Sequence, residues 1–297
     1  MTRSARPAWV APYLARLGVD APGAPTLDAL RALHRAHVER LPYETLDIQM
    51  GVATSVDRRE AVRRVLAGRG GYCVQLNTAF GALLSALGYQ VTGHRAGIQG
   101  RGATAPSDAG FAPHLTLTTR LDGDAWLVDA GLGDGLYEPV RLAQGPVEHG
   151  PLRFTLLPSR VEPGGWRLEH DPRGSITAMD VRPAPAANDE FAAWHPYLAT
   201  SPNSRLVRAV CVMRRDASGA DVLMGCVLRR IDAAGRSTRE LPTAAAWYEA
   251  LADVFGLRLA EISPQRRETL WEKVRKAHEE WLSAAPKMPV DEQLTTM

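Results

Sequence analysis

The sequence predicts an α+β fold in three parts, because the residue pattern changes twice along the chain. Residues 1–90 place apolar side chains at three- and four-residue steps, which is typical of helices. From 91 to 207, short β-rich runs alternate with Gly, Pro and Asp turns, which predicts a central antiparallel sheet or barrel. Residues 208–285 combine strands with two helices, and residues 286–297 are expected to form a loose tail.

The first part contains four predicted helices. A short helix covers residues 13–17, and Thr26 is placed to cap the start of the second helix. Residues 58–66 form the third. The fourth runs over residues 73–87, where the apolar period is clear and Gly88 follows as a stop.

The later elements are predicted from β-rich runs and from helical periodicity. Strand signals in the central part lie at residues 90–92, 115–119, 126–129 and 166–169. The last part is predicted to contain strands at 206–213 and 222–231, a turn at 216–219 between them, and helices at 243–255 and 263–283. It is therefore expected to be a small α/β unit.

Composition and charge restrict the class of protein. The chain has 297 residues, of which 45% are hydrophobic and 23% charged, as in a globular enzyme. A net charge of +2 argues against nucleic acid as a partner, and no apolar run of about 18 residues predicts a membrane span. The first residues contain no apolar signal segment, and three cysteines form no disulfide framework, so a cytoplasmic location is expected. No metal site is predicted.

Cys73 lies at the start of the fourth helix, directly after Gly70, Gly71 and Tyr72. Free backbone N–H groups and the helix dipole favour a thiolate at this position, and a thiolate is a nucleophile. The alternative is an ordinary small core residue, since unpaired cysteines are often buried. Cys211 and Cys226 lie in apolar strand runs and are expected to be inert packing residues.

A predicted hairpin supplies a base and an orienting carboxylate for this thiol. Asp122-Gly123 is a strong two-residue hairpin signal between two alternating runs. In that register Thr116 pairs with Asp129, so His114 and Asp129 share a face as diagonal neighbours roughly 7 Å apart. The alternative is a surface histidine with an unrelated aspartate.

Four other histidines are less suited to a catalytic or metal-binding role. His94 and His149 are competing bases, but both lie in Gly-flanked turns that hold a ring poorly. His34 and His37 lie three apart on the apolar face of the second helix, where packing is the expected role rather than metal binding.

These residues lie in segments that resemble the arylamine N-acetyltransferase family over nearly the whole chain. The run from Leu41 to Asp47 resembles the family's Ile-Pro-Phe-Glu-Asn-Leu segment. The run from Arg69 to Asn77 matches the Arg-Gly-Gly-x-Cys signature around the family's nucleophile. Further matching segments are Pro113-His114-Leu115, residues 127–133 and residues 200–204.

The resemblance implies a fold and a mechanism. The fold is a helical bundle, a β-barrel and an α/β lid, with the core shared by cysteine proteases and transglutaminases. The mechanism is ping-pong acetyl transfer from acetyl-CoA, a co-substrate rather than a tightly bound cofactor, to an arylamine or hydrazine. Cys73, His114 and Asp129 would be the catalytic triad, and Glu44 and Arg69 a supporting ion pair.

The resemblance also implies residues that contact the coenzyme and exposes departures from the family. The coenzyme contacts it implies are Gly131, Gly133, Thr200, Ser201 and Ser204. The departures are Gln75 in place of Glu, and Leu132 and Leu206 in place of Phe. The two leucines weaken the expected preference for flat aromatic amines and for acetyl over larger acyl groups.

Other functions stay open at this point. An amide synthase that closes a macrolactam or releases a carrier-bound polyketide would use the same fold. A cysteine hydrolase would use the same Cys-His-Asp order. A non-catalytic binding protein on a decayed scaffold is disfavoured by the intact triad. The sequence leaves open the acceptor amine, the acyl length, the pathway and the oligomeric state, a homodimer among them.

Overall fold

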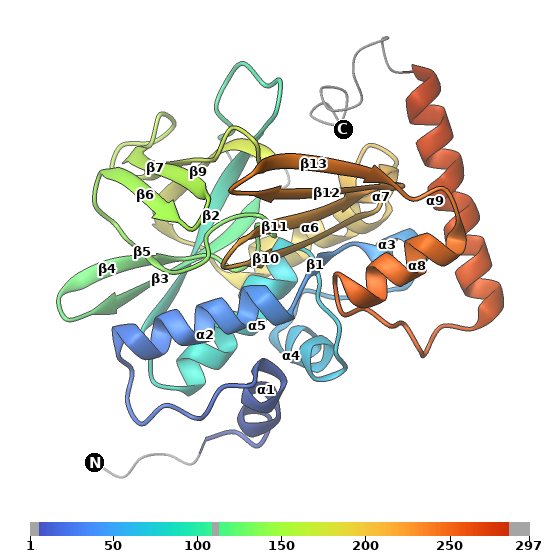
Figure 1. The fold of residues 1–297 in the computed structure, drawn as a ribbon. Coiled ribbons are helices and arrows are strands. Elements are labelled where there is room, and N and C mark those ends of the chain that lie inside the picture. The colour runs from blue at the N-terminus through green and yellow to red at the C-terminus, as the bar shows by residue number, and fades with distance from the viewer. Residues whose placement is uncertain (1–5, 109–112, 285–297) are drawn as a thin grey trace.

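Two antiparallel sheets organise the protein, and helices pack around them (Figure 1). The computed structural model describes residues 6–108 and 113–284. The predicted tail at 286–297 lies outside the described residues.

The N-terminal helices pack on one another and on the larger, eight-stranded sheet. They are α1 (Val10–Leu17), α2 (Leu27–Arg40), α3 (Leu46–Gln49), α4 (Arg58–Leu66) and α5 (Cys73–Ala86). Thr26 caps α2 through a bond from the Ala29 N–H to its hydroxyl, 3.3 Å long, as expected. The apolar faces of α1, α2, α4 and α5 form one core with Leu115 and Leu117 of that sheet.

The larger sheet is a nearly closed, eight-stranded antiparallel barrel in the order β5-β4-β3-β2-β9-β8-β7-β6. Its strands are β2 (Val91–Gly100), β3 (His114–Leu121), β4 (Asp124–Val128), β5 (Val140–Arg141), β6 (Gly145–His149), β7 (Leu152–Pro158), β8 (Trp166–Glu169) and β9 (Ile176–Pro185). A separate apolar cluster fills the barrel, built from residues such as Leu127, Phe154 and Met179.

The hairpin between β3 and β4 has the predicted register. Leu121 pairs with Asp124, and Leu117 pairs with Val128. Asp122 and Gly123 have φ angles of 52° and 87°, as a two-residue hairpin turn of the right twist requires. The strand positions from which His114 and Asp129 project are therefore set by this turn.

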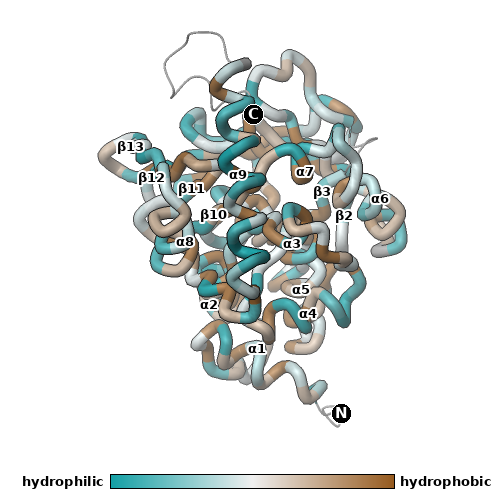
Figure 2. The backbone as a smooth tube through the Cα atoms, turned by 90° about the vertical axis from the view of Figure 1, so that its right-hand side faces the viewer, coloured by the Kyte–Doolittle hydropathy of each residue, from teal (hydrophilic) through white to brown (hydrophobic). Residues whose placement is uncertain are grey.

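The second sheet has the order β1-β10-β11-β12-β13. Its strands are β1 (Tyr43–Glu44), β10 (Cys211–Asp216), β11 (Gly219–Met224), β12 (Val227–Asp232) and β13 (Gly235–Glu240). Two helices cover it, α8 (Ala244–Asp253) and α9 (Pro264–Ala284). Figure 2 shows α9 as a largely hydrophilic surface helix, with Leu270 and Val274 buried on its inner face.

Several predicted elements were wrong in extent or type. The run 222–231 is two strands, because Gly225 has a φ of 55° and turns the chain between β11 and β12. The run 206–213 begins as the short helix α7 (Arg205–Arg208), and its strand starts at Cys211. Helix α6 (Asn188–Thr200) was not predicted at all, and it lies where only strands were expected.

A buried ionic cluster fastens the segment before Cys73 to β1. Arg69 Nη2 lies 2.9 Å from Glu44 Oε1 and 3.0 Å from Asp47 Oδ1. Arg64 also pairs with both carboxylates, and its Nε donates to the Gly70 carbonyl over 2.9 Å. Burial alone would raise the pKa of Asp47, but Arg69 and Arg64 lower it. Removing either arginine would leave two buried carboxylates sharing one cation, and the unbalanced buried charge would destabilise the fold.

We predict that Gly70→Ala destabilises the fold by at least about 2 kcal/mol, because a Cβ atom there would lie 1.8 Å from the Pro42 carbonyl oxygen. Urea unfolding followed by circular dichroism measures the change. Gly23→Ala is the matched control, since a Cβ at Gly23 meets nothing within 4 Å. Equal midpoints for the two variants would contradict the close approach of the two backbone segments.

Candidate active site

Cys73 is the first residue of α5, and its thiol is half-buried. The helix start is held by Gln75, whose Oε1 accepts from the Tyr72 N–H at 3.2 Å. The Gln75 amide also donates to the Ser55 carbonyl at 3.1 Å. The neutral amide at this position therefore serves as a structural cap that ties the helix of Cys73 to the preceding loop.

His114 and Asp129 form a buried, hydrogen-bonded pair. His114 Nε2 lies 2.6 Å from Asp129 Oδ2, and both side chains are shielded from solvent. Cys73 lies near enough to the imidazole to raise the pKa of His114 together with Asp129. The structure thus brings together the three residues that the sequence placed on separate segments.

Charge interactions set the protonation of this group. Burial disfavours the imidazolium, yet Asp129 and Cys73 together raise the pKa of His114 to about 10. Burial would likewise raise the pKa of Asp129, but His114, Asn77 and Thr116 lower it. At neutral pH the site therefore holds a protonated imidazole beside an ionised carboxylate.

Asn77 completes the site, and sequence reasoning assigned it no role. Its amide donates to Asp129 Oδ1 at 3.0 Å and to the Leu115 carbonyl at 2.6 Å. Its carbonyl accepts from the Ala130 N–H at 2.9 Å. The available signal was spacing, because Asn77 lies four residues after Cys73 and therefore on the same face of α5.

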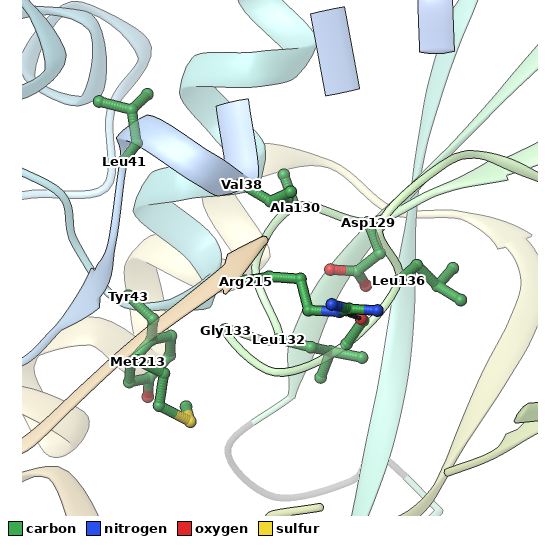
Figure 3. Close-up of a pocket in the computed structure, with 11 residues that line it drawn as sticks. Val38, Leu41, Tyr43, Asp129, Ala130, Leu132, Gly133, Leu136, Met213 and Arg215 are labelled. Atoms are coloured by element: carbon green, nitrogen blue, oxygen red, sulfur yellow. Dashed lines mark hydrogen bonds between the residues drawn. The ribbon is translucent and has the colours of Figure 1, made fainter. Parts of the chain in front are cut away.

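The loop at residues 131–135 packs directly on the first turn of α5. A Cβ atom on Gly131 would lie 2.9 Å from the Cys73 carbonyl oxygen and 2.6 Å from Asn77 Nδ2. One on Gly133 would lie 2.7 Å from the Met213 Cβ. Such approaches exclude any side chain, so glycine at both positions lets the loop cover the site. Figure 3 shows this loop running from Asp129 past Leu132 and Gly133.

The remaining predicted coenzyme contacts lie in the turn between α6 and α7. The Thr200 hydroxyl donates to the Pro196 carbonyl at 2.7 Å, within α6. Ser204 is buried, and its hydroxyl donates to the Leu198 carbonyl at 2.8 Å. The Ser201 hydroxyl accepts from the Asn203 N–H at 3.3 Å. These hydroxyls shape the turn, and a coenzyme contact from them stays a prediction.

The other histidines serve the packing of the fold. His94 contacts Thr118 Oγ1 at 2.9 Å and the Arg182 carbonyl at 3.1 Å inside the barrel. His149 accepts from the Tyr137 N–H at 3.1 Å, and burial, with smaller effects of nearby cations, lowers its pKa to about 4. His34 and His37 are fully buried against Phe80.

A cysteine at a helix start, beside a buried histidine–carboxylate pair, is the arrangement used by enzymes with an activated thiol nucleophile. None of the helices in the described ranges is long and apolar enough to cross a membrane.

Comparison with known proteins identifies the family to which the chain belongs. A family model for N-acetyltransferase matches residues 26–263. The arylamine N-acetyltransferase of Mycobacterium tuberculosis is 31% identical over 269 residues, which cover 84% of this chain and 89% of the relative. The structure of Mycobacterium marinum arylamine N-acetyltransferase in complex with CoA superposes with a TM-score of 0.77 at 25% identity, covering 90% of this chain and 99% of that one. Proansamycin X synthase of Amycolatopsis mediterranei is 30% identical over 177 residues, 57% of this chain and 64% of the synthase.

The chain belongs to the arylamine N-acetyltransferase family. The predicted family and the predicted α+β fold class are both confirmed.

We predict that at pH 7 iodoacetamide alkylates Cys73 faster in the unaltered protein than in His114→Ala. His114 keeps its proton at this pH, since its pKa is raised to about 10, and the positive charge beside the sulfur increases its nucleophilic reactivity. Intact mass spectrometry measures the rate of alkylation.

The control variants separate the pair from general effects on folding. His114→Ala should slow the alkylation of Cys73, while His278→Gln on α9 should leave its rate unchanged. Cys211 and Cys226 should label slowly, because burial raises the pKa of their thiols to about 12 and about 11. Equal rates in the unaltered protein and in His114→Ala would rule out activation of Cys73 by His114.

Proposed function

We propose that this protein transfers an acetyl group from acetyl-CoA to the nitrogen of an arylamine or hydrazine, through an acyl-Cys73 intermediate. The observation that carries the proposal is the buried His114–Asp129 pair, 2.6 Å between Nε2 and Oδ2, with Cys73 beside the imidazole. Membership of the arylamine N-acetyltransferase family supports the substrate classes.

In the first half-reaction, the Cys73 thiolate attacks the carbonyl carbon of the thioester. The C–S bond to the coenzyme breaks, and the departing thiolate takes the proton of the His114 imidazolium. Asp129 holds the ring by its 2.6 Å bond and offsets the positive charge until the proton leaves. The products of this step are acyl-Cys73, a neutral His114 and free coenzyme A.

In the second half-reaction, the amine nitrogen attacks the carbonyl carbon of acyl-Cys73. His114 accepts a proton from the amine, and the C–S bond to Cys73 breaks. The amide is released, and the thiolate and imidazolium return to their starting state. His114 therefore begins the first half-reaction protonated and the second half-reaction neutral. This change of protonation state accounts for the proton transfers in both half-reactions.

The coenzyme is proposed to approach through the glycine-rich loop. Gly131 and Gly133 pack against Cys73 and Met213, so this loop borders the site directly beside the thiol that a thioester must reach. Contacts from Thr200, Ser201 and Ser204 would come from the adjacent turn. The similar M. marinum structure was determined in complex with CoA, which supports a site for the same donor here.

The second candidate function is an amide synthase acting on a bulky acyl chain. Leu132 and Leu206 stand at positions where the family has aromatic residues. Their aliphatic side chains would suit a bulkier acyl chain. The likeness to proansamycin X synthase, at 30% identity over 57% of this chain, favours keeping this function under test.

The proposal also covers the cellular location of the enzyme, its oligomeric state and its division into domains. We propose a cytoplasmic enzyme, because all three cysteines are free. A homodimer and the division at residues 90, 207 and 285 remain predictions. Size-exclusion chromatography with light scattering tests the dimer.

We predict that mixing the protein with acetyl-CoA, without an acceptor amine, produces a covalent acetyl adduct on Cys73. The adduct should be absent in Cys73→Ala and retained in Cys226→Ala, since Cys226 is buried away from the site. Intact mass spectrometry with propionyl- and malonyl-CoA in parallel tests the acyl preference. Adding an aniline or a hydrazide should then discharge the adduct.

Each outcome bears on a different candidate. No adduct from any acyl-CoA would refute the acetyltransferase and favour the amide synthase, which draws its acyl group from another carrier. An adduct that decays equally fast with and without amine would indicate a hydrolase. An adduct that persists in Cys73→Ala would overturn the assignment of the nucleophile.

A further inference from the structure

Tyr43 places a phenol beside the reaction site, where the resembling family segment has phenylalanine. It lies on β1, paired with Met213 of β10, and it also forms a parallel bridge with Gly71, two residues before Cys73. The Glu44 N–H donates to the Gly71 carbonyl at 3.0 Å, which fixes this bridge. The backbone of Tyr43 therefore runs alongside the segment that delivers the nucleophile.

The glycine-rich loop contacts Cys73 and Tyr43 through two nearby residues. A Cβ atom on Gly131 would lie 3.0 Å from the Cys73 Cα, and one on Gly133 would lie 3.1 Å from the Tyr43 Cβ. Two residues of chain span at most about 7 Å, so Cys73 and Tyr43 border the same short stretch of loop. Figure 3 shows Tyr43 next to Met213, on the Gly133 side of the loop that begins at Asp129.

The Tyr43 hydroxyl makes no hydrogen bond to any other residue within the described ranges. Five other tyrosine hydroxyls have protein partners: Tyr13, Tyr72, Tyr89, Tyr137 and Tyr248. Burial, and next the charge of Cys73, raise the pKa of Tyr43 well above its usual value, so the O–H stays protonated. The group is therefore a neutral O–H donor without a protein acceptor among the described residues, and Cys73 lies near enough to affect its pKa.

We propose that the Tyr43 hydroxyl donates a hydrogen bond to the oxyanion that forms on the acyl carbonyl during transfer to and from Cys73. This inference rests on the proposed acyl-cysteine mechanism. It makes Tyr43 a catalytic residue, working with the Cys73 N–H, which is the natural backbone donor at the helix start.

The same hydrogen bond serves both half-reactions. When sulfur attacks the thioester, a C–S bond forms and the carbonyl π electrons move to oxygen. Tyr43 keeps its proton and stabilises that charge until the bond to the coenzyme sulfur breaks. When the amine attacks acyl-Cys73, the oxyanion forms at the same place and collapses by expelling the Cys73 thiolate. His114 handles every proton that moves.

Tyr43→Phe removes only the hydroxyl oxygen and tests this role directly. Rapid mixing with acetyl-CoA measures the acetylation rate of Cys73, and addition of an aniline to the acetylated protein measures the second rate. We expect both rate constants to fall by a similar factor of about 100- to 1000-fold. The matched control is Tyr248→Phe, whose hydroxyl donates to the Arg267 carbonyl at 2.7 Å on the outer helices, and both rates should be unchanged.

The alkylation rate of Cys73 by iodoacetamide distinguishes the two possible roles of Tyr43. A structural role would change this rate, and an oxyanion role would not. The reaction of iodoacetamide with Cys73 displaces iodide at carbon and forms no oxyanion, so Tyr43→Phe should alkylate at the rate of the unaltered protein. Slower alkylation would show that Tyr43 positions the thiolate instead, and would overturn the proposal. A change confined to the KM for the amine would indicate acceptor binding and would also overturn it.

Failure of this inference is distinguishable from failure of the proposed function. If the unaltered protein forms no acetyl adduct, the acyl-cysteine mechanism itself is wrong. If it forms the adduct and Tyr43→Phe matches it in both rates, the mechanism stands and the oxyanion role of Tyr43 is refuted.

Discussion

The Asp129 carboxylate is the buried charge that three parts of the fold must satisfy together. Its Oδ2 meets His114 of β3, and its Oδ1 accepts from Asn77 of α5 at 3.0 Å and from the Gly131 N–H at 2.8 Å. A buried carboxylate without these partners would cost several kcal/mol. Strand, helix and loop are therefore locked in one arrangement, and that arrangement is the one that puts an imidazole next to Cys73.

A second group of buried charges fixes the segment that leads into α5. Arg64 and Arg69 join Glu44 and Asp47, and Arg64 reaches the carbonyl of Gly70 in the segment leading to Cys73. The Gln75 side chain also fixes the start of α5, because its amide donates to the Ser55 carbonyl in the loop before α4. Cys73 thus stands on a backbone that is fixed on both sides, and displacements of its thiol from His114 are resisted.

The sequence predicted best where short-range chemistry decides the structure. The Asp122-Gly123 turn fixed the β3–β4 register, and hence the face shared by His114 and Asp129, without any long-range information. Helix α6 was missed because it contains Pro196 and weak amphipathic patterning, and β13 because its residues are polar and mostly exposed. β1 could not be predicted, since two residues carry no period and their partner strand is far along the chain. The role of Asn77 depends on the meeting of α5 with the barrel, which no local pattern encodes.

The placement of β1 also has a consequence for how the protein is made. Tyr43 pairs with Met213, and Thr45 exchanges hydrogen bonds with Cys211, 166 residues later. A ribosome needs roughly ten to thirty seconds to cover that distance, and contacts this remote in sequence form late in folding. The helices and the barrel can assemble during this time, but β1 cannot yet pair with β10 beside Cys73. We therefore expect the nascent chain to become reactive in a single late step, once its final third has emerged, rather than gradually as each part folds.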